Sequence, residues 1–275
     1  MKTRKKAGLA AGADSAFVSL GNGAYRASEL TRGPWNPDHQ HAGPPIALVA
    51  GEIERAARQL EFTHVARLTA NLLRPIPITQ LSVQVQSEYA GRNVAHFAGQ
   101  LRAEGKEVAR FTAVAQRESD IAVPAGAAGH PLPLAPRTVD ESAPARFPFS
   151  RVRTGYQDLI ECRVAQGRFF RGPCAAWIRM RHPLVAGEEP SGLQRVAVAA
   201  DSSNGMSAVL DFSRYVFVNS DLTINLLRRP QGEWICVDAQ TLVGPAGNGL
   251  AEARIFDAQG LVGRSTQSLP IRRRD

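Results

Sequence analysis

An internal repeat constrains the fold of this chain more than any other feature of its sequence. Segment 68–74 (LTANLLR) recurs at 222–228 (LTINLLR), with six identities in seven positions at an offset of 154 residues. At the same offset, segment 108–113 matches 262–267 in three of six positions. Because two separate matches share one offset, we predict that the chain holds two copies of one fold.

A proline-rich segment lies between the two copies. Residues 119–150 hold six of the 18 prolines of the chain, among Ala and Gly residues and without hydrophobic periodicity. This composition is typical of a connecting segment. We therefore expect a basic flexible tail at 1–14, an N-terminal domain at 15–118, a linker at 119–150 and a C-terminal domain at 151–275.

Each copy reads as a helix combined with antiparallel strands. In the first copy, apolar residues recur every three or four positions from Ile46 to Leu60, and Gly43-Pro44-Pro45 places proline in the first helical turn. Segment 196–210 is the expected helix of the second copy. Alternating apolar and polar residues predict antiparallel strands, at 81–86, 94–102 and 107–117 in the first copy and at 169–181, 216–227, 234–242, 250–256 and 261–271 in the second. The predicted fold class is α+β.

The net charge of +8 does not indicate a nucleic-acid partner, because most of it lies at the two ends. Residues 2–6 contribute +4 and residues 272–275 contribute +2, which leaves +2 for the rest of the chain. A nucleic-acid surface needs a basic patch on the folded body. No apolar run reaches the roughly 18 residues of a membrane span, and no secretory signal follows the basic start. We expect a cytoplasmic protein with neither a nucleic-acid nor a membrane partner.

Several kinds of site lack their motif in this sequence. There is no GxSxG elbow, phosphate-binding P-loop or GxGxxG segment. His39 and His41 precede a helix instead of lying on one at a spacing of four, so we expect a loop role at the mouth of a groove and no metal ion. The three cysteines form no CxxC pair and no even disulfide framework, so they are interpreted as core residues. No cofactor is expected.

Four short segments, taken in order, resemble one family of enzymes. They are HQHAGPP at 39–45, ADSSNG at 200–205, DLT at 221–223 and GRSTQS at 263–268. Together with the repeat, they are similar to the double-hotdog acyl-CoA thioesterases of the type II family. The resemblance implies two tandem hotdog folds, each a long helix wrapped by a curved antiparallel sheet. It covers roughly 15–118 and 150–272.

The resemblance also implies a set of active-site residues in the C-terminal domain. The family places an acidic residue on the second helix, a Ser or Thr on the next strand and a Gln on the last strand, which here become Asp201, Thr223 and Gln267. An alignment anchored further along the chain replaces Thr223 by Asn219 or Ser220. Because strand residues alternate between faces, Asn219 would share the face of Thr223 and Ser220 would not. Thr223 is therefore the first choice and Asn219 the second.

The two copies differ at the same positions. An offset of 154 relates Asp201 to Ala47 and Gln267 to Ala113. Buried polar groups are costly unless they have partners, so a core that needed only packing would use alanine at both places. The asymmetry predicts one competent site per chain.

These residues predict hydrolysis of acyl-CoA thioesters to a free acid and CoA. Asp201 would act as a general base or as a direct nucleophile, and the sequence leaves both open. The alternative is a non-catalytic acyl-CoA or acyl-chain binding protein of the same fold. A hotdog hydratase or dehydratase ranks lowest, because segment 196–210 contains no His. The acyl-CoA substrate is the expected partner, and further surfaces permit a homo-oligomer.

Overall fold

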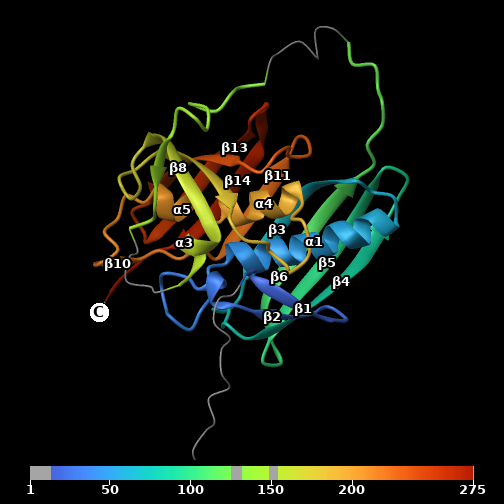
Figure 1. Ribbon diagram of the computed structural model, residues 1–275, viewed down its shortest axis with the longest axis horizontal. Helices are drawn as coiled ribbons and strands as arrows, with labels where there is room; N and C mark the ends of the chain where they lie inside the picture. The colour runs from blue at the N-terminus through green and yellow to red at the C-terminus, as the bar shows by residue number, and fades with distance from the viewer. Residues whose placement is uncertain (1–13, 125–131, 149–153, 275) are drawn as a thin grey trace, which may run out of the picture.

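The computed structural model describes residues 14–124, 132–148 and 154–274. Within these ranges, one 13-stranded antiparallel sheet runs through the whole protein, and helices lie against it (Figure 1). The strands of this sheet are β1 (Phe17–Gly21), β2 (Ala24–Ala27), β3 (His64–Leu72), β4 (Gln80–Ala90), β5 (Val94–Ala103), β6 (Lys106–Gln116), β7 (Ala143–Ala145), β8 (Ile160–Gly167), β9 (Cys174–Met180), β11 (Asp221–Leu226), β12 (Ile235–Val243), β13 (Asn248–Asp257) and β14 (Gly260–Pro270).

The two sides of the sheet have corresponding strand orders, and the second side carries one additional edge strand, β7. From β3 outward the order is β6, β5, β4, β2 and β1, and from β11 outward it is β14, β13, β12, β9, β8 and β7. In each half a helix precedes the strand that lies at the centre of the sheet: α1 (Gly43–Gln59) follows β2 and precedes β3, and α4 (Gly192–Ala200) follows β9 and precedes β11. The α+β hotdog architecture expected from the sequence is present.

The two central strands meet at equivalent residues of the repeat. β3 and β11 pair antiparallel, with Thr69 opposite Thr223, and the Thr223 hydroxyl donates to the Thr69 hydroxyl at 3.2 Å. The neighbouring strands keep the repeat as well, because Thr69 pairs with Thr112 and Thr223 pairs with Thr266. This register places a local two-fold relation between Thr69 and Thr223, at the centre of the sheet.

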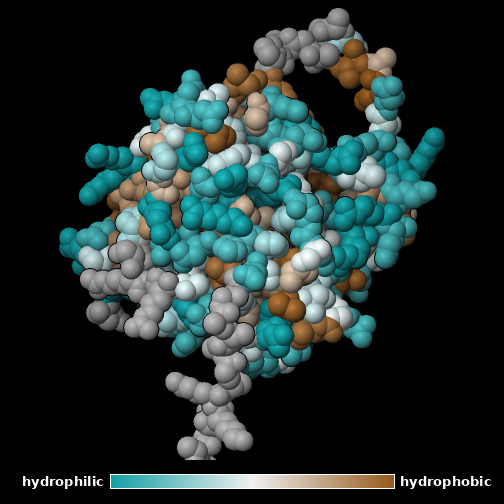
Figure 2. All heavy atoms as spheres, viewed as in Figure 1, coloured by the Kyte–Doolittle hydropathy of each residue, from teal (hydrophilic) through white to brown (hydrophobic). Residues whose placement is uncertain are grey.

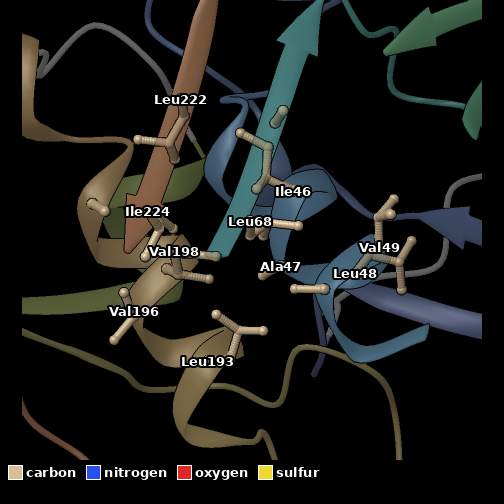
Figure 3. Packing of buried hydrophobic residues seen from close by; sticks show 14 of the residues in the cluster. Ile46, Ala47, Leu48, Val49, Leu68, Leu193, Val196, Val198, Leu222 and Ile224 are labelled. Atoms are coloured by element: carbon tan, nitrogen blue, oxygen red, sulfur yellow. The ribbon is translucent and has the colours of Figure 1, made fainter. Parts of the chain in front are cut away.

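Helix α1 forms where the sequence predicts it. Pro44 and Pro45 occupy its first turn, where proline loses no helical hydrogen bond, and the residues from Gly43 to Ala50 are all buried. Two glycines allow α4 to approach closely: a Cβ on Gly51 would lie 2.2 Å from Gln194 Nε2, and one on Gly43 would lie 2.9 Å from the Val198 carbonyl. Figure 3 shows side chains of α1 and α4 packed with Leu68 of β3 and with Leu222 and Ile224 of β11.

The second helix differs from the expected 196–210. It begins four residues earlier, where Ser191 and Gln194 form a capping box, and it ends at Ala200 with Asp201 as its C-cap. A separate short helix, α5 (Ser203–Met206), follows. Serine and asparagine compete with the backbone for hydrogen bonds and are poor residues for a helix interior, so 202–204 interrupts the apolar pattern.

Three further segments depart from the expected strands. The predicted strand 216–227 is divided into β10 (Tyr215–Val216), which pairs with β15 (Arg272–Arg273), and β11, so Asn219 and Ser220 precede the strand. The predicted strand 169–181 is only β9, and β8 was missed. The short helices η1 (Glu29–Thr31) and α3 (Tyr156–Leu159) were also not predicted.

The proline-rich segment is more than a connection. Its described part contains β7, which pairs with β8, and Phe147 is 6% exposed. The basic tail predicted at 1–14 lies outside the described residues except for Asp14. In Figure 2 the visible face is largely hydrophilic, with scattered hydrophobic residues. No described helix has the length and apolar character needed to cross a membrane.

Candidate active site

Asp201 lies at the end of α4 and is almost completely enclosed. Only 3% of its surface is exposed. Among the described residues, its carboxylate contacts three side chains, Asn219, Gln267 and His41, which come from three distant parts of the chain. A buried carboxylate is stable only with such partners, and these three supply amide and imidazole groups.

Gln267, on β14, is held on both sides of its amide. Its Nε2 donates to the Asp201 carbonyl at 3.3 Å and lies 3.4 Å from Asp201 Oδ1, while its Oε1 accepts from the Asn204 backbone N–H at 3.0 Å. The side chain is fully buried. The amide therefore links the end of α4 to the start of α5 and orients the carboxylate.

Asn219 approaches Asp201 from the segment that leaves the sheet before β11. Its Nδ2 donates to Asp201 Oδ1 at 3.0 Å and to the Asp221 carbonyl at 3.2 Å. The contact exists because 217–220 is not a regular strand, so the alternation of faces assumed from the sequence does not apply to Asn219.

The two hydroxyl candidates, Thr223 and Ser220, have other hydrogen-bond partners. Thr223 bonds to Thr69 at the centre of the sheet, and Ser220 donates to the Ser268 carbonyl at 3.2 Å. Neither is among the hydrogen-bond partners of Asp201 in the described part of the chain. The structure thus joins Asp201, Asn219 and Gln267 by hydrogen bonds. Ser220 shares only the lining of the larger cavity with Asp201, and Thr223 is not part of that lining.

His41 completes the group, and the sequence had indicated only a loop role for it. Its Nδ1 lies 2.9 Å from Asp201 Oδ2. Its ring stacks on Tyr156, with centroids 3.8 Å apart and an interplanar angle of 6°. The sequence signals were the position of His41 just before a helix and its place in segment 39–45, which carries part of the resemblance. Neither could reveal that α1 begins beside the end of α4.

Tyr156 supports the His41 ring from a buried position. Its hydroxyl donates to the Val198 carbonyl at 2.7 Å and lies 2.8 Å from Ser202 Oγ. Burial raises the pKa of Tyr156 well above its ordinary value, so the phenol stays neutral near pH 7. A neutral ring with a fixed hydroxyl gives His41 one flat surface to pack against.

Two cavities meet at this group. One, of about 360 Å³, is lined by Asp201 and Asn219 together with Arg74 and Ile76. The other is bordered by aromatic side chains, which include Phe147, Tyr156 and Phe212. His41, Trp35 and Asn204 line both cavities. The Asp201 group therefore lies between a larger cavity with mixed polar and apolar walls and a smaller aromatic one.

Neither a metal centre nor a reactive thiol stands out in the described ranges. Residues 14–124, 132–148 and 154–274 hold no group of three or more His, Cys, Asp or Glu side chains arranged to bind a metal ion. The three cysteines are buried and free. Burial raises the pKa of Cys162 and of Cys174 to about 12, so both thiols are protonated at neutral pH, as expected of core residues.

Comparison with known proteins identifies the family to which the chain is similar. Residues 31–116 match the family model of the acyl-CoA thioesterase N-terminal domain, and residues 132–271 match that of the acyl-CoA thioesterase C-terminal domain. No curated protein sequence matches the chain significantly.

Solved structures share the fold over nearly the full length. An acyl-CoA thioesterase II from Mycobacterium marinum has a TM-score of 0.65 at 17% identity, over 94% of this chain and 96% of that one. A hotdog-fold protein of unknown function from Alicyclobacillus acidocaldarius has a TM-score of 0.66 at 14% identity, over 95% and 97% of the two chains. With both family models matched in order, the chain belongs to the double-hotdog acyl-CoA thioesterase family.

Proposed function

We propose that this protein hydrolyses acyl-CoA thioesters to a free acid and CoA, at a site centred on Asp201. The observation that carries the proposal is the buried carboxylate held by Asn219, Gln267 and His41 at the junction of two cavities. A fold that needed only packing would not place these four polar side chains together, because the desolvation cost of each must be offset by hydrogen bonds.

The two cavities suggest how a substrate would lie. The aromatic cavity, of about 50 Å³, has room for the first carbons of an acyl chain, and the larger cavity, with Arg74 on its wall, suits the phosphopantetheine part of CoA. The thioester carbonyl would then lie beside His41 and Asp201. Asn219, rather than Thr223, is the partner of Asp201 that we propose from the contact at 3.0 Å.

We further propose that the halves are two tandem hotdog domains, at 15–118 and 151–275, related by duplication. The support is the repeated strand order and the pairing of Thr69 with Thr223. Thr223 then has a structural role at the junction. A cytoplasmic location, a place in fatty acid metabolism, a homo-oligomeric assembly and the absence of a nucleic-acid partner remain expectations from the sequence.

The experiment that tests the function measures thiol release. The purified protein is incubated with acyl-CoAs of graded chain length and a thiol reagent. Turnover of at least one of them is expected. Binding of acyl-CoA without any release of thiol would favour the non-catalytic alternative. If the protein neither binds acyl-CoA nor releases thiol, both functions are rejected.

A further inference from the structure

The Asp201 carboxylate has little capacity left for a substrate or a water molecule. Oδ1 lies 3.0 Å from Asn219 Nδ2 and 3.4 Å from Gln267 Nε2, and Oδ2 lies 2.9 Å from His41 Nδ1. These contacts take three of the roughly four acceptor positions of a carboxylate. With 3% of the residue exposed, little of the carboxylate is open to a water molecule. Asp201 is therefore poorly placed to take a proton from water itself.

The geometry instead assigns a proton to His41 Nδ1. Two atoms compete for this nitrogen: Asp201 Oδ2 at 2.9 Å and the Gly43 backbone N–H at 3.2 Å. If Nδ1 carried a lone pair, it would face the carboxylate oxygen without a proton between them. The shorter, charge-assisted contact decides the tautomer, so Nδ1–H donates to Asp201.

The second ring nitrogen of His41 is then available. Within the described residues, Nε2 makes no hydrogen bond, and 14% of the side chain is exposed. His41 lines both cavities, whereas Asp201 lines only the larger one. Stacking on Tyr156 fixes the plane of the ring, so the direction of the Nε2 lone pair is fixed as well.

We propose that His41 is a catalytic residue, the general base of the reaction, and that Asp201 is the residue that positions it; this inference rests on the proposed thioesterase function. His41 Nε2 takes a proton from water as the water oxygen bonds to the thioester carbonyl carbon. The tetrahedral intermediate then collapses, the C–S bond breaks, and the proton on Nε2 passes to the departing CoA thiolate. The products are the free acid and CoA. A carboxylate that holds the far nitrogen of an imidazole is an established way of orienting such a base.

The test separates the basic nitrogen from the hydrogen bond to Asp201. His41→Asn keeps an N–H donor near the position of Nδ1 and removes Nε2. With the best acyl-CoA substrate, kcat is expected to fall by roughly 10²- to 10⁴-fold while KM changes little. His41→Ala should be rescued by added imidazole, which should not accelerate the parent protein. His96→Asn is the matched control, because His96 is exposed on β5 beside Tyr89.

Each outcome bears on the inference. If His41 had only a structural role, the kcat of His41→Asn would stay within about twofold of the parent value. Such a change is far below a tenfold effect, which corresponds to ~1.4 kcal/mol, and it would overturn the proposal. Failure of imidazole to rescue a folded His41→Ala would also overturn it. If His41→Ala does not fold, His41→Asn alone decides. Absence of thiol release by the parent protein with every acyl-CoA would instead refute the proposed function.

Discussion

Two cavities at equivalent places in the two halves have similar walls and different polar groups. The cavity at Asp201 is lined by Leu72 and Ile76, and a second cavity, of about 260 Å³, is lined by Leu226 and Pro230, their counterparts at an offset of 154. In the second cavity the carboxylate is Glu54 of α1. The repeated fold therefore forms two cavities of the same kind, and the side chains decide what each can do.

The residue in front of the facing helix differs between the two cavities. His41 precedes α1 and contacts Asp201, whereas Ser191 precedes α4 and its hydroxyl donates to Glu54. A serine at this position caps its helix and offers no basic nitrogen. His64 also lines this cavity, but its Nε2 lies 3.2 Å from the Leu226 carbonyl, and the side-chain hydrogen bond to the Glu54 carboxylate comes from Ser191. Within the described residues, Glu54 thus has no imidazole hydrogen-bonded to it as Asp201 has.

The amide partners are also missing from the Glu54 cavity. At the offset of 154, Asn219 corresponds to Val65 and Gln267 to Ala113. Both Val65 and Ala113 are buried. One half keeps an apolar core where the other holds a hydrogen-bonded network, which predicts that only the Asp201 cavity is competent.

The largest difference we expect concerns stability. Arg228 forms a bidentate ion pair with Asp257, at 2.6 and 2.5 Å, and the Asp257 side chain is fully buried. Arg228→Ala should lower the free energy of unfolding by about 3–5 kcal/mol, because the buried carboxylate loses its counter-ion and keeps only backbone N–H donors. Its counterpart Arg74 is exposed, so Arg74→Ala should cost about 1 kcal/mol or less. Urea unfolding of both variants measures the difference.

The same ion pair has a defined pH dependence. Burial alone would raise the pKa of Asp257, but hydrogen bonds from Arg228 and from the backbone N–H groups of Gln231 and Gln259 more than offset it and lower the pKa. A lowered folded-state pKa stabilises the fold above the unfolded value, and this contribution is lost as the pH falls through the folded value. The cost of Arg228→Ala should therefore shrink in acid. A cost that is constant with pH would contradict the ion-pair explanation.

The next largest effect is expected on turnover, from the two amide side chains that bond to Asp201. Asn219→Ala and Gln267→Ala each remove a donor that orients Asp201, and kcat/KM is expected to fall by roughly 10²-fold. Thr223→Val, at the centre of the sheet, should leave the rate within about threefold of the parent. Steady-state kinetics on the three variants compares them. A larger loss in Thr223→Val than in Asn219→Ala would restore Thr223 as the partner of Asp201.

Introducing polar groups into the first half should lower stability without raising thioesterase activity. Ala113→Gln buries an amide in an apolar core and is expected to destabilise the protein by about 1–3 kcal/mol. Ala47→Asp should destabilise the protein in the same way, because it buries a carboxylate there. The nearby Gln194 Nε2 already donates to the Ala47 backbone carbonyl. Thermal melts and thiol release measure both effects. A rise in turnover in either variant would show that the first half is closer to competence than we infer.

The smallest effect is expected at Glu54. Burial raises the pKa of Glu54, although its contacts with Ser191, Arg58 and Arg229 oppose the shift. An acid with a raised folded-state pKa costs stability above that pKa, and the cost disappears as the pH falls below the unfolded value. Glu54→Gln should thus stabilise the protein by up to about 1 kcal/mol at pH 8 and not at pH 4. Stabilisation that persists at pH 4 would contradict this cause.

The parts of the fold that depend on local pattern could be predicted from the sequence. Proline in a first turn and regular apolar spacing located α1, and the turn residues around Asp257 located the final hairpin. β7 was missed because it lies in a segment with the composition of a linker, and its pairing with β8, which the local pattern does not encode, makes it a strand. β8 could have been predicted, because Ile160, Cys162 and Val164 alternate with polar residues.

Only those residues of the candidate site that a local sequence motif marks could be predicted. Asp201 and Gln267 could be found by the repeat and the resemblance. Asn219 was ranked second because alternation was extended through 216–220, where the chain leaves the sheet. His41 could not be assigned to the site, because it lies 160 residues from Asp201 and only the antiparallel approach of α1 and α4 joins them.

The most direct test of the account compares the two carboxylates in one assay. Asp201→Asn and Glu54→Gln are measured for thiol release from the same acyl-CoA, with melting temperatures to confirm folding. The account predicts a loss of roughly 10²-fold or more in Asp201→Asn and a rate within about twofold of the parent in Glu54→Gln. If folded Asp201→Asn retained the parental rate, or if Glu54→Gln lost as much activity as Asp201→Asn, the assignment of a single site at Asp201 would be wrong.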